Sequence, residues 1–354
     1  MSTSVGAFGS GIGGGVELTI KNVAQELINR GLTVHLVAPS GSHSETIPIV
    51  NITGTVHPFA QNQSRDQDIN FPANSVLANM WQYALQVQHS YDLIVNFAYD
   101  WLPFYLTPFF QTPTAHFVSM GSLSRMMDRM ILQCLQTFPY SIGMYTQAQI
   151  DSFQFDPLLA NQIRILSSGI DLSLYEFCEE PEPALGWVAR IAPEKGLEDA
   201  AQVSAELGIE LRIMGKMQDL AYWEQVQKDY PQAKLNYTGF HDTHKLQALL
   251  GKCQALLMTP KWVEAFGNVA IEALACGVPV ISYARGGPVE IIKHGRTGFL
   301  VEPDSIEGLC TAVTNLPRIS RLTCRRNAEA EFSLTALGDR FIDWFREILT
   351  NRRS

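Results

Sequence analysis

The chain has 354 residues, more than one hydrophobic core usually supports, so we expect two domains. Hydrophobic residues make up 46% of the sequence and charged residues 17%, a composition that is typical of globular domains and excludes long disordered segments. The net charge of -9 excludes a strongly basic surface, and we expect no nucleic acid as a partner.

Short runs of β-branched residues alternate with amphipathic helical stretches along almost the whole chain. This alternation is typical of parallel sheets covered by helices, so the predicted fold class is α/β. The predicted strands are, in chain order, Thr33–Ala38, Leu93–Asn96, Thr114–Val118, Ile163–Leu166, Leu185–Val188, Glu210–Met214, Leu235–Thr238, Ala255–Thr259 and Val278–Ser282.

A domain boundary is predicted near 168–182, where a Gly-Ile-Asp turn leads into an acidic stretch that contains prolines. We therefore expect an N-terminal domain over 1–170 and a C-terminal domain over 171–336. The segment 337–350 carries aromatic residues at helical spacing and should form an amphipathic helix on a domain surface, with the N-terminal domain as the candidate. The glycine-rich loop begins by Gly6, so Met1–Val5 should supply only the end of a truncated first strand.

The six cysteines form no C-x-x-C pair and no zinc-ligand spacing, so we expect reduced core residues. The start of the chain has neither the basic nor the apolar region of a signal peptide, and the most apolar run, 101–110, is too short to span a bilayer. These patterns favour a soluble cytoplasmic protein with no membrane partner. His241 and His244 could suggest a metal pair, but no nearby residue completes a ligand set, and we expect no metal.

The first motif is the run GSGIGGGVE at 9–17, which leads into a helical pattern. Its five glycines allow tight turns that bring backbone amides, including those of Gly13, Gly14 and Gly15, toward an anion at the start of the helix. A flexible linker or plain turn is an alternative, because no acidic residue ends a clear second strand about 20 residues later, as in dinucleotide-binding sites.

The second motif is GWVARIAPEKG at 186–196, which follows a predicted strand and precedes a helix. Arg190 and Lys195 lie five residues apart across a turn that contains a proline, so both cations could converge on one diphosphate. The alternative is a solvated surface turn.

The third motif is EAFGNVAIE at 264–272, followed by ALACGVPVIS. A helix that begins near Gly267 would direct the free amides of Gly267, Asn268 and Val269 at phosphate oxygens. Carboxylates accept hydrogen bonds from vicinal hydroxyls, so one of Glu264 and Glu272 could hold a hexose and the other a ribose. The alternative is an ordinary glutamate in the first turn of a helix and an ordinary surface glutamate.

The order of these motifs resembles that of the family 4 glycosyltransferases, retaining enzymes with the GT-B fold, in which two Rossmann-like domains face each other across a cleft. The resemblance covers nearly the whole chain. Its most specific parts are the Arg-x4-Lys-Gly turn, the Glu-x7-Glu helix, the run GGPVEII from Gly286 and the run GRTGFLVEP from Gly295.

The resemblance implies a role for each motif. Arg190 and Lys195 would hold the diphosphate of a nucleotide sugar, Glu264 its hexose and Glu272 its ribose. The loop Gly13–Gly15 would approach the donor phosphates. The implied co-substrate is a nucleotide sugar, with UDP-glucose as the first guess, and protein cations take the place of a metal cofactor.

The sequence departs from the family at a histidine that usually ends an N-domain strand. Counted from Pro113, the family's spacing reaches Ser119. His116 lies three residues earlier and, by strand alternation, on the opposite face. His116 is therefore a candidate catalytic residue, and a buried core histidine is an equal alternative.

Aromatic residues are concentrated at 96–110, just after a predicted strand, where open α/β sheets place ligands. Stacking on Tyr99 or Trp101, with Asp100 paired to ring nitrogens, would select a small flat acceptor. The glycine-rich opening is similar to that of cyanobacterial pterin glucosyltransferases, which makes a tetrahydropterin the first candidate. The six Lys and Arg residues of 1–170 are too dispersed to dock on anionic lipid. The aromatic residues could equally be core packing.

Three other functions are compatible with this pattern: a glycosyltransferase with a sugar or lipid acceptor, a nucleotide-sugar epimerase or dehydrogenase on a similar fold, and a binding protein without activity. A dehydrogenase would need a complete first strand and an acidic ribose ligand near the glycine-rich loop, and neither is evident. The presence of every expected donor-side charge argues against an inactive protein.

Overall fold

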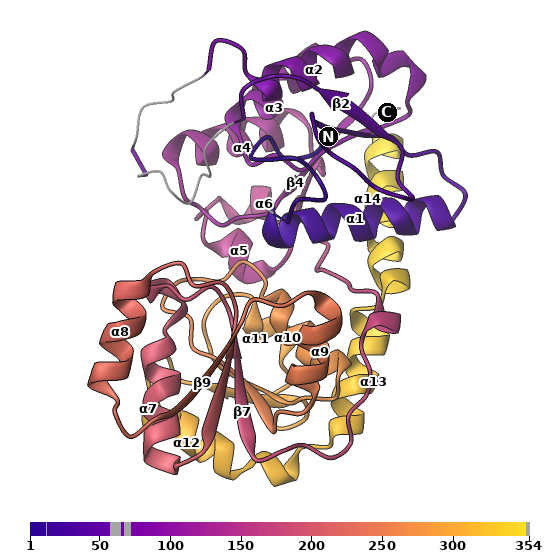
Figure 1. Ribbon diagram of the computed structural model, residues 1–354. Helices are drawn as coiled ribbons and strands as arrows, with labels where there is room; N and C mark the ends of the chain where they lie inside the picture. Colours follow the sequence, from indigo (N-terminus) through magenta and orange to yellow (C-terminus); the bar gives the residue numbers. More distant parts are fainter. Residues whose placement is uncertain (12, 57–64, 67–71, 352–354) are drawn as a thin grey trace. The chain divides into compact units, whose positions relative to one another are not determined.

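The computed structural model describes residues 1–11, 13–56, 65–66 and 72–351 (Figure 1). The chain divides into two compact units. The first unit comprises Met1–Ser168 and Leu334–Ser354, and the second comprises Gly169–Ser333. These divisions lie close to the predicted boundaries after residues 170 and 336.

The first unit is built on parallel strands in a two-stranded sheet, β1-β2, and a four-stranded sheet, β3-β4-β5-β6. The strands are β1 (Leu36–Pro39), β2 (Ile49–Ile52), β3 (Ile94–Asn96), β4 (Thr114–Val118), β5 (Ile142–Met144) and β6 (Arg164–Ile165). The helices are α1 (Gly14–Asn29), α2 (Val76–Val87), α3 (Trp101–Leu106), α4 (Arg125–Thr137), α5 (Gln147–Asp151), α6 (Pro157–Ala160) and α14 (Leu334–Asn351).

The first two residues join the two sheets of this unit. The Met1 ammonium donates to Val95 O at 2.8 Å, and the Phe97 N–H donates to Met1 O at 3.1 Å. The Ser2 N–H donates to Val37 O at 2.9 Å. Met1 and Ser2 thus lie between β1 and β3, the place of the first strand in a doubly wound sheet.

Helix α14 packs on the first unit through the aromatic face noted in the sequence. Phe341 and Trp344 are buried. The Phe341 ring lies 5.6 Å from the ring of Phe117 in β4, and the Trp344 indole N–H donates to Tyr140 O at 2.7 Å. Helix α14 therefore completes the core of the first unit, which also contains the N-terminal residues.

The second unit contains one parallel sheet of six strands in the order β12-β11-β10-β7-β8-β9. Its strands are β7 (Ala184–Val188), β8 (Glu210–Met214), β9 (Lys234–Gly239), β10 (Ala255–Met258), β11 (Val280–Tyr283) and β12 (Gly298–Val301). Its helices are α7 (Leu197–Leu207), α8 (Leu220–Asp229), α9 (Thr243–Gly251), α10 (Asn268–Ala275), α11 (Pro288–Ile291), α12 (Ile306–Thr314) and α13 (Arg321–Glu331).

Helices α7, α8 and α12 cover one face of this sheet, and α9 and α10 cover the other (Figure 1). Every residue of β10 and β11 is buried, as expected for parallel strands covered on both faces. The strand order reverses between β7 and β10, and this pair is therefore the topological switch point of the sheet.

The parallel sheets confirm the predicted α/β class, and each predicted strand overlaps an observed one. Three strands were not predicted: β2, β5 and β12. The run His241–His244, considered above as a metal pair, is a helix start, because the Asp242 carboxylate accepts the Lys245 N–H at 2.9 Å and caps α9. In the described ranges, no helix combines the length and the apolar character needed to cross a membrane.

Candidate functional site

The candidate site lies at the carboxyl edge of the second unit's sheet, where β7 and β10 are neighbours. The turn after β7 carries Arg190 and Lys195, and the loop after β10 carries Glu264. Open α/β sheets bind ligands outside the carboxyl ends of the strands at the switch point. Two motifs that the sequence analysis treated separately therefore meet at the place where this architecture puts its ligands.

The turn and the loop pack directly on each other at Gly196. Gly196 adopts φ 65° and begins α7, and a Cβ atom there would lie 2.0 Å from the Thr259 carbonyl oxygen. The buried Thr259 hydroxyl donates to Gly196 O at 2.6 Å. Only glycine permits this approach, because any other side chain would collide with the backbone after β10.

Lys195 and Glu264 form the centre of the site. The Lys195 ammonium lies 2.6 Å from Glu264 Oε2, and the Trp262 indole N–H donates to the same oxygen at 3.0 Å. The ammonium also lies 4.6 Å from the centroid of the Trp262 ring, a cation–π contact. The Lys195 and Glu264 side chains are 16% and 20% exposed. Within the described part of the chain, Glu264 Oε1 accepts no hydrogen bond, so one carboxylate oxygen is anchored and the other can receive a ligand hydroxyl.

Trp262 was missed in the sequence analysis. Its sequence signal is an aromatic residue two positions before the first glutamate of the third motif, in a loop that follows a strand.

Arg190 belongs to the same turn but has different partners. Its guanidinium donates to Gln218 Oε1 and to Glu194 Oε1, the latter at 3.1 Å. Lys195 is held by Glu264 instead. The convergence of both cations on one diphosphate therefore stays a prediction.

Helix α10 begins immediately after the loop that carries Glu264. Its N-cap, Gly267, has φ 102° in the left-handed region that favours glycine. The first amides of a helix have no acceptor within the helix, so those of Gly267, Asn268 and Val269 can bind an anion, as the motif predicts. The buried Oδ1 atom of Asn268 has no hydrogen-bond partner among the described residues, which places an unsatisfied polar group at this helix start.

Glu272 lies further along α10. Burial raises the pKa of its carboxyl to about 7, although a hydrogen bond with the Tyr175 hydroxyl acts in the opposite direction. A carboxyl with this pKa changes its charge near neutral pH, so any ligand that needs the ionised form will bind in a pH-dependent way.

The glycine-rich loop of the first unit surrounds a carboxylate of its own chain. The N–H groups of Gly9 and Gly11 donate to Glu17 Oε1 at 2.8 and 3.2 Å, and the Gly13 N–H donates to Glu17 Oε2 at 3.0 Å. Of these three amides, that of Gly13 belongs to the set that the sequence analysis expects to face an anion. The anion in this structure is Glu17, and a role for Gly13, Gly14 and Gly15 toward donor phosphates stays a prediction.

His116 requires a correction. It is completely buried in β4, its ring stacks on Phe104 with centroids 4.2 Å apart, and its two nitrogens bond to Asn96 Nδ2 at 3.2 Å and Thr107 Oγ1 at 2.8 Å. Burial lowers the pKa of His116 to about 3. A neutral, enclosed imidazole of this kind contradicts the expected catalytic role and matches the core alternative. Ser119, which follows the carboxyl end of β4, is partly exposed.

The expected acceptor residues have structural partners in the first unit. The Tyr99 hydroxyl donates to Gly121 O at 3.0 Å, and the Asp100 carboxylate caps α3 by accepting the Leu102 N–H at 3.1 Å. Trp101 is the first residue of α3. All three expected residues are only partly buried, so each retains surface for a ligand.

The exposed aromatic residues of the segment 96–110 are Tyr105 and Phe109, not the expected acceptor residues Tyr99 and Trp101. Tyr105 and Phe109 line a groove beside α4, together with Phe138 near the end of that helix. Phe104 and Phe110 are buried. Core packing therefore accounts for part of this aromatic segment.

The second unit is similar to a known protein family. Residues 177–329 match the family model described as glycosyl transferases group 1. Glycogen synthase of Mycobacterium tuberculosis is 31% identical over 194 residues, which are 51% of this chain and 46% of that protein. The 2-deoxystreptamine N-acetyl-D-glucosaminyltransferase of Niallia circulans is 33% identical over 129 residues, which are 35% of this chain and 33% of that protein. The matched regions thus span less than half the length of these relatives.

Solved structures share the fold over nearly the whole chain. HepE of Anabaena, in complex with UDP and glucose, has a TM-score of 0.72 at 17% identity and covers 97% of this chain and 98% of its own. Sucrose-phosphate synthase of Thermosynechococcus elongatus has a TM-score of 0.71 at 18% identity and covers 96% of this chain and 94% of its own. The chain therefore has the two-domain α/β fold of glycosyltransferase structures, and its residues 177–329 are similar to the glycosyl transferases group 1 family.

Proposed function

We propose that this protein is a cytoplasmic retaining glycosyltransferase that moves a hexose, glucose from UDP-glucose, to a small soluble acceptor. The observation that carries the proposal is the cluster of Lys195, Trp262 and Glu264 at the switch point of the second unit. It places a cation, an aromatic ring and a carboxylate with an open oxygen beside the first amides of α10. The group 1 domain and the UDP and glucose of the Anabaena HepE complex support this choice of donor.

In this proposal, positive groups of the second unit stabilise the departing nucleoside diphosphate. Its negative charge increases as the bond to the hexose breaks, and positioned donors that face developing charge lower the barrier. Arg190, Lys195 and the amides of Gly267–Val269 supply these donors. Charge-assisted hydrogen bonds to phosphate are stronger than neutral ones, so the cations carry most of this effect.

The two glutamates of α10 and its preceding loop bind hydroxyl groups of the donor. Glu264 Oε1 accepts a hydrogen bond from the hexose while the Trp262 indole holds Oε2 in place. Glu272 accepts hydrogen bonds from the ribose. The hexose contact must persist while the anomeric carbon reacts, so Glu264 affects the chemical step, whereas Glu272 affects nucleotide affinity.

For the acceptor we propose a flat molecule, with a tetrahydropterin as the first candidate, bound by the first unit near Tyr99, Asp100 and Trp101. The partly exposed carboxylate and aromatic rings there suit a heteroaromatic ligand with ring nitrogens. Transfer from UDP-glucose to a reduced pterin, a simple sugar and a lipid acceptor should be compared in parallel. Robust transfer to the lipid alone would exclude this acceptor proposal.

The donor proposal is tested by thermal shift with UDP, UDP-glucose and other nucleotide sugars, because a ligand that binds only the folded state raises the melting temperature. Lys195→Met should abolish the shift, whereas Lys252→Met should retain it. Lys252 is an exposed lysine that pairs with Glu182 at 3.4 Å at the opposite edge of the sheet. If none of the nucleotide sugars shifts the wild-type protein, the donor assignment is wrong. NMR of the product then decides between retention and inversion.

A further inference from the structure

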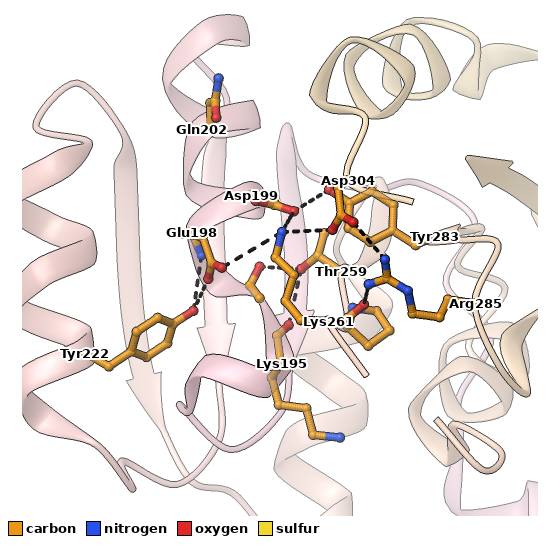
Figure 2. Close-up of polar contacts among 12 residues, drawn as sticks. Lys195, Glu198, Asp199, Gln202, Tyr222, Thr259, Lys261, Tyr283, Arg285 and Asp304 are labelled. Atoms are coloured by element: carbon orange, nitrogen blue, oxygen red, sulfur yellow. Dashed lines mark hydrogen bonds and ion pairs between the residues drawn. The ribbon is translucent and has the colours of Figure 1, made fainter. Parts of the chain in front are cut away.

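The loop after β10 is tied to its surroundings by a second ionic cluster, which consists of Lys261, Asp199, Asp304 and Arg285 (Figure 2). The Lys261 ammonium lies 2.5 Å from Asp199 Oδ2 and 3.1 Å from Asp304 Oδ1. Its backbone N–H donates to Glu194 O at 2.9 Å. One residue thus connects the turn after β7, the first turn of α7 and the loop after β12.

The two acidic partners of Lys261 also form hydrogen bonds or ion pairs with other side chains. The Asp199 side chain is 10% exposed and accepts a hydrogen bond from the Tyr283 hydroxyl at the end of β11. Asp304 adopts φ 65°, a left-handed conformation that aspartate tolerates better than most residues other than glycine. The Arg285 guanidinium holds Asp304 at 2.7 Å and donates to Pro260 O at 2.7 Å.

These contacts fix the loop from both sides of Lys261. Thr259 and Pro260 are bonded to Gly196 and Arg285, and Trp262 and Glu264 follow within three residues. In Figure 2 the Lys195 side chain points away from the Lys261 cluster. Among the interactions of the described residues, the Lys261 side chain pairs with carboxylates other than Glu264, so any influence on the pair of Lys195 and Glu264 passes through the backbone of the loop.

We infer that Lys261 is a positioning residue for the proposed donor site, which it serves by holding the segment 259–264 so that Glu264 meets the hexose. This inference rests on the proposed function. A carboxylate that must reach a sugar hydroxyl at hydrogen-bond distance loses its effect when its loop shifts by about 1 Å. Loss of Lys261 should therefore weaken the binding of ligands that carry a hexose but not the binding of the nucleotide alone.

The test compares the binding of UDP and UDP-glucose by isothermal titration calorimetry, which gives both the dissociation constant and the number of sites. For Lys261→Met we expect UDP-glucose to bind about tenfold more weakly, the effect of one hydrogen bond to a charged group, and UDP to bind no more weakly than to the wild type. Lys261→Arg should restore most of the loss, since a guanidinium can also bridge two carboxylates. Lys252→Met, the matched lysine variant, should change neither constant.

A purely structural role predicts a different pattern. If the role were purely structural, Lys261→Met would weaken the binding of UDP and UDP-glucose equally, or would reduce the number of sites for both at unchanged affinity. Either result overturns the inference. Removal of Lys261 leaves the carboxylate of Asp199 enclosed without its cation, and this variant could fail to fold. The double variant Lys261→Met with Asp199→Asn removes that charge and should show the same selective loss of UDP-glucose.

Hydrogen exchange separates this inference from the proposed function. In the ligand-free protein, amides of 259–267 should exchange faster in Lys261→Met, or in the double variant, than in the wild type, whereas amides of α9 should not. Unchanged exchange in 259–267 would overturn the inference whether or not a nucleotide sugar binds. If the wild type binds neither UDP nor UDP-glucose, the proposed function fails, and the positioning role at a donor site fails with it even where exchange increases.

Discussion

Relative to the wild type, the Glu272→Gln variant should be more stable at about pH 8 than at about pH 5. Burial raises the pKa of this carboxyl from 4.5 to about 7. Between these values the folded protein binds more protons than the unfolded chain, so stability decreases as the pH rises. The favourable contribution is complete below the unfolded pKa and is lost as the pH passes through the folded pKa.

The size of the effect follows from the same two values. At about 1.36 kcal/mol for each pH unit, a rise from 4.5 to about 7 limits the loss to about 3 kcal/mol. Because Glu272 is only partly enclosed, the observed change should lie below this limit. Glutamine is neutral at every pH and keeps an oxygen that can accept a hydrogen bond from Tyr175. The stability of Glu272→Gln should therefore not decrease in this way as the pH rises.

Urea unfolding at several pH values between about 5 and 8 checks this prediction. The free energy of unfolding of Glu272→Gln minus that of the wild type should grow with pH, by at most roughly 2.5 kcal/mol over the range. Glu224→Gln, a change of an exposed glutamate on α8, should give a difference independent of pH. A constant difference for Glu272→Gln as well would refute the burial of an ionisable carboxyl at this position.

Three further predictions concern the donor site and the last helix. Arg190→Ala and Lys195→Ala should each lower kcat about 10²- to 10³-fold at an unchanged circular dichroism spectrum, the usual effect of losing one positioned donor, and near-normal turnover would exclude the proposed clamp. Glu264→Gln should lower kcat and Glu272→Ala should raise the donor KM in steady-state kinetics, whereas equal effects on KM alone would contradict both roles. Trp344→Ala should destabilise the first unit by about 3 to 5 kcal/mol in denaturant titrations, and a loss below about 1 kcal/mol would show that α14 does not complete its core.

The sequence was sufficient to predict most of the observed strands and the position of Lys195 and Glu264 just after two of them. Runs of buried β-branched residues identify strands of a parallel sheet, and charged or glycine-rich residues just after them fall at the carboxyl edge by the geometry of the fold. Lys195 and Glu264 could therefore be assigned to the same edge although they are 69 positions apart. Strand β5, by contrast, has the sequence Ile-Gly-Met, which contains a single β-branched residue and a glycine that is unfavourable in strands.

The contacts of the site depend on packing between distant segments and could not be predicted in this way. Lys261 binds Asp199 and Asp304, and the ring of Trp262 contacts Lys195. These partners are distant in the chain, and nothing in the sequence next to Lys261 or Trp262 identifies them. His116 shows the limit of strand alternation. All five residues of β4 are buried, so in this strand opposite faces do not separate exposed from enclosed residues.

The geometry around Glu264 favours a ligand that carries both a diphosphate and a hexose over either group alone. In the ligand-free protein Lys195 already binds a carboxylate, so a diphosphate must compete with Glu264 for this cation, and only the difference between the two interactions contributes to affinity. A hexose offers a hydroxyl to Oε1, the oxygen that Lys195 and Trp262 leave open, and stabilises the carboxylate as the cation turns toward phosphate. In the proposed function, recognition of the two parts of the donor is therefore coupled through one side chain. Such coupling requires a fixed position of Glu264, and the contacts of Thr259, Pro260 and Lys261 hold the loop that carries it.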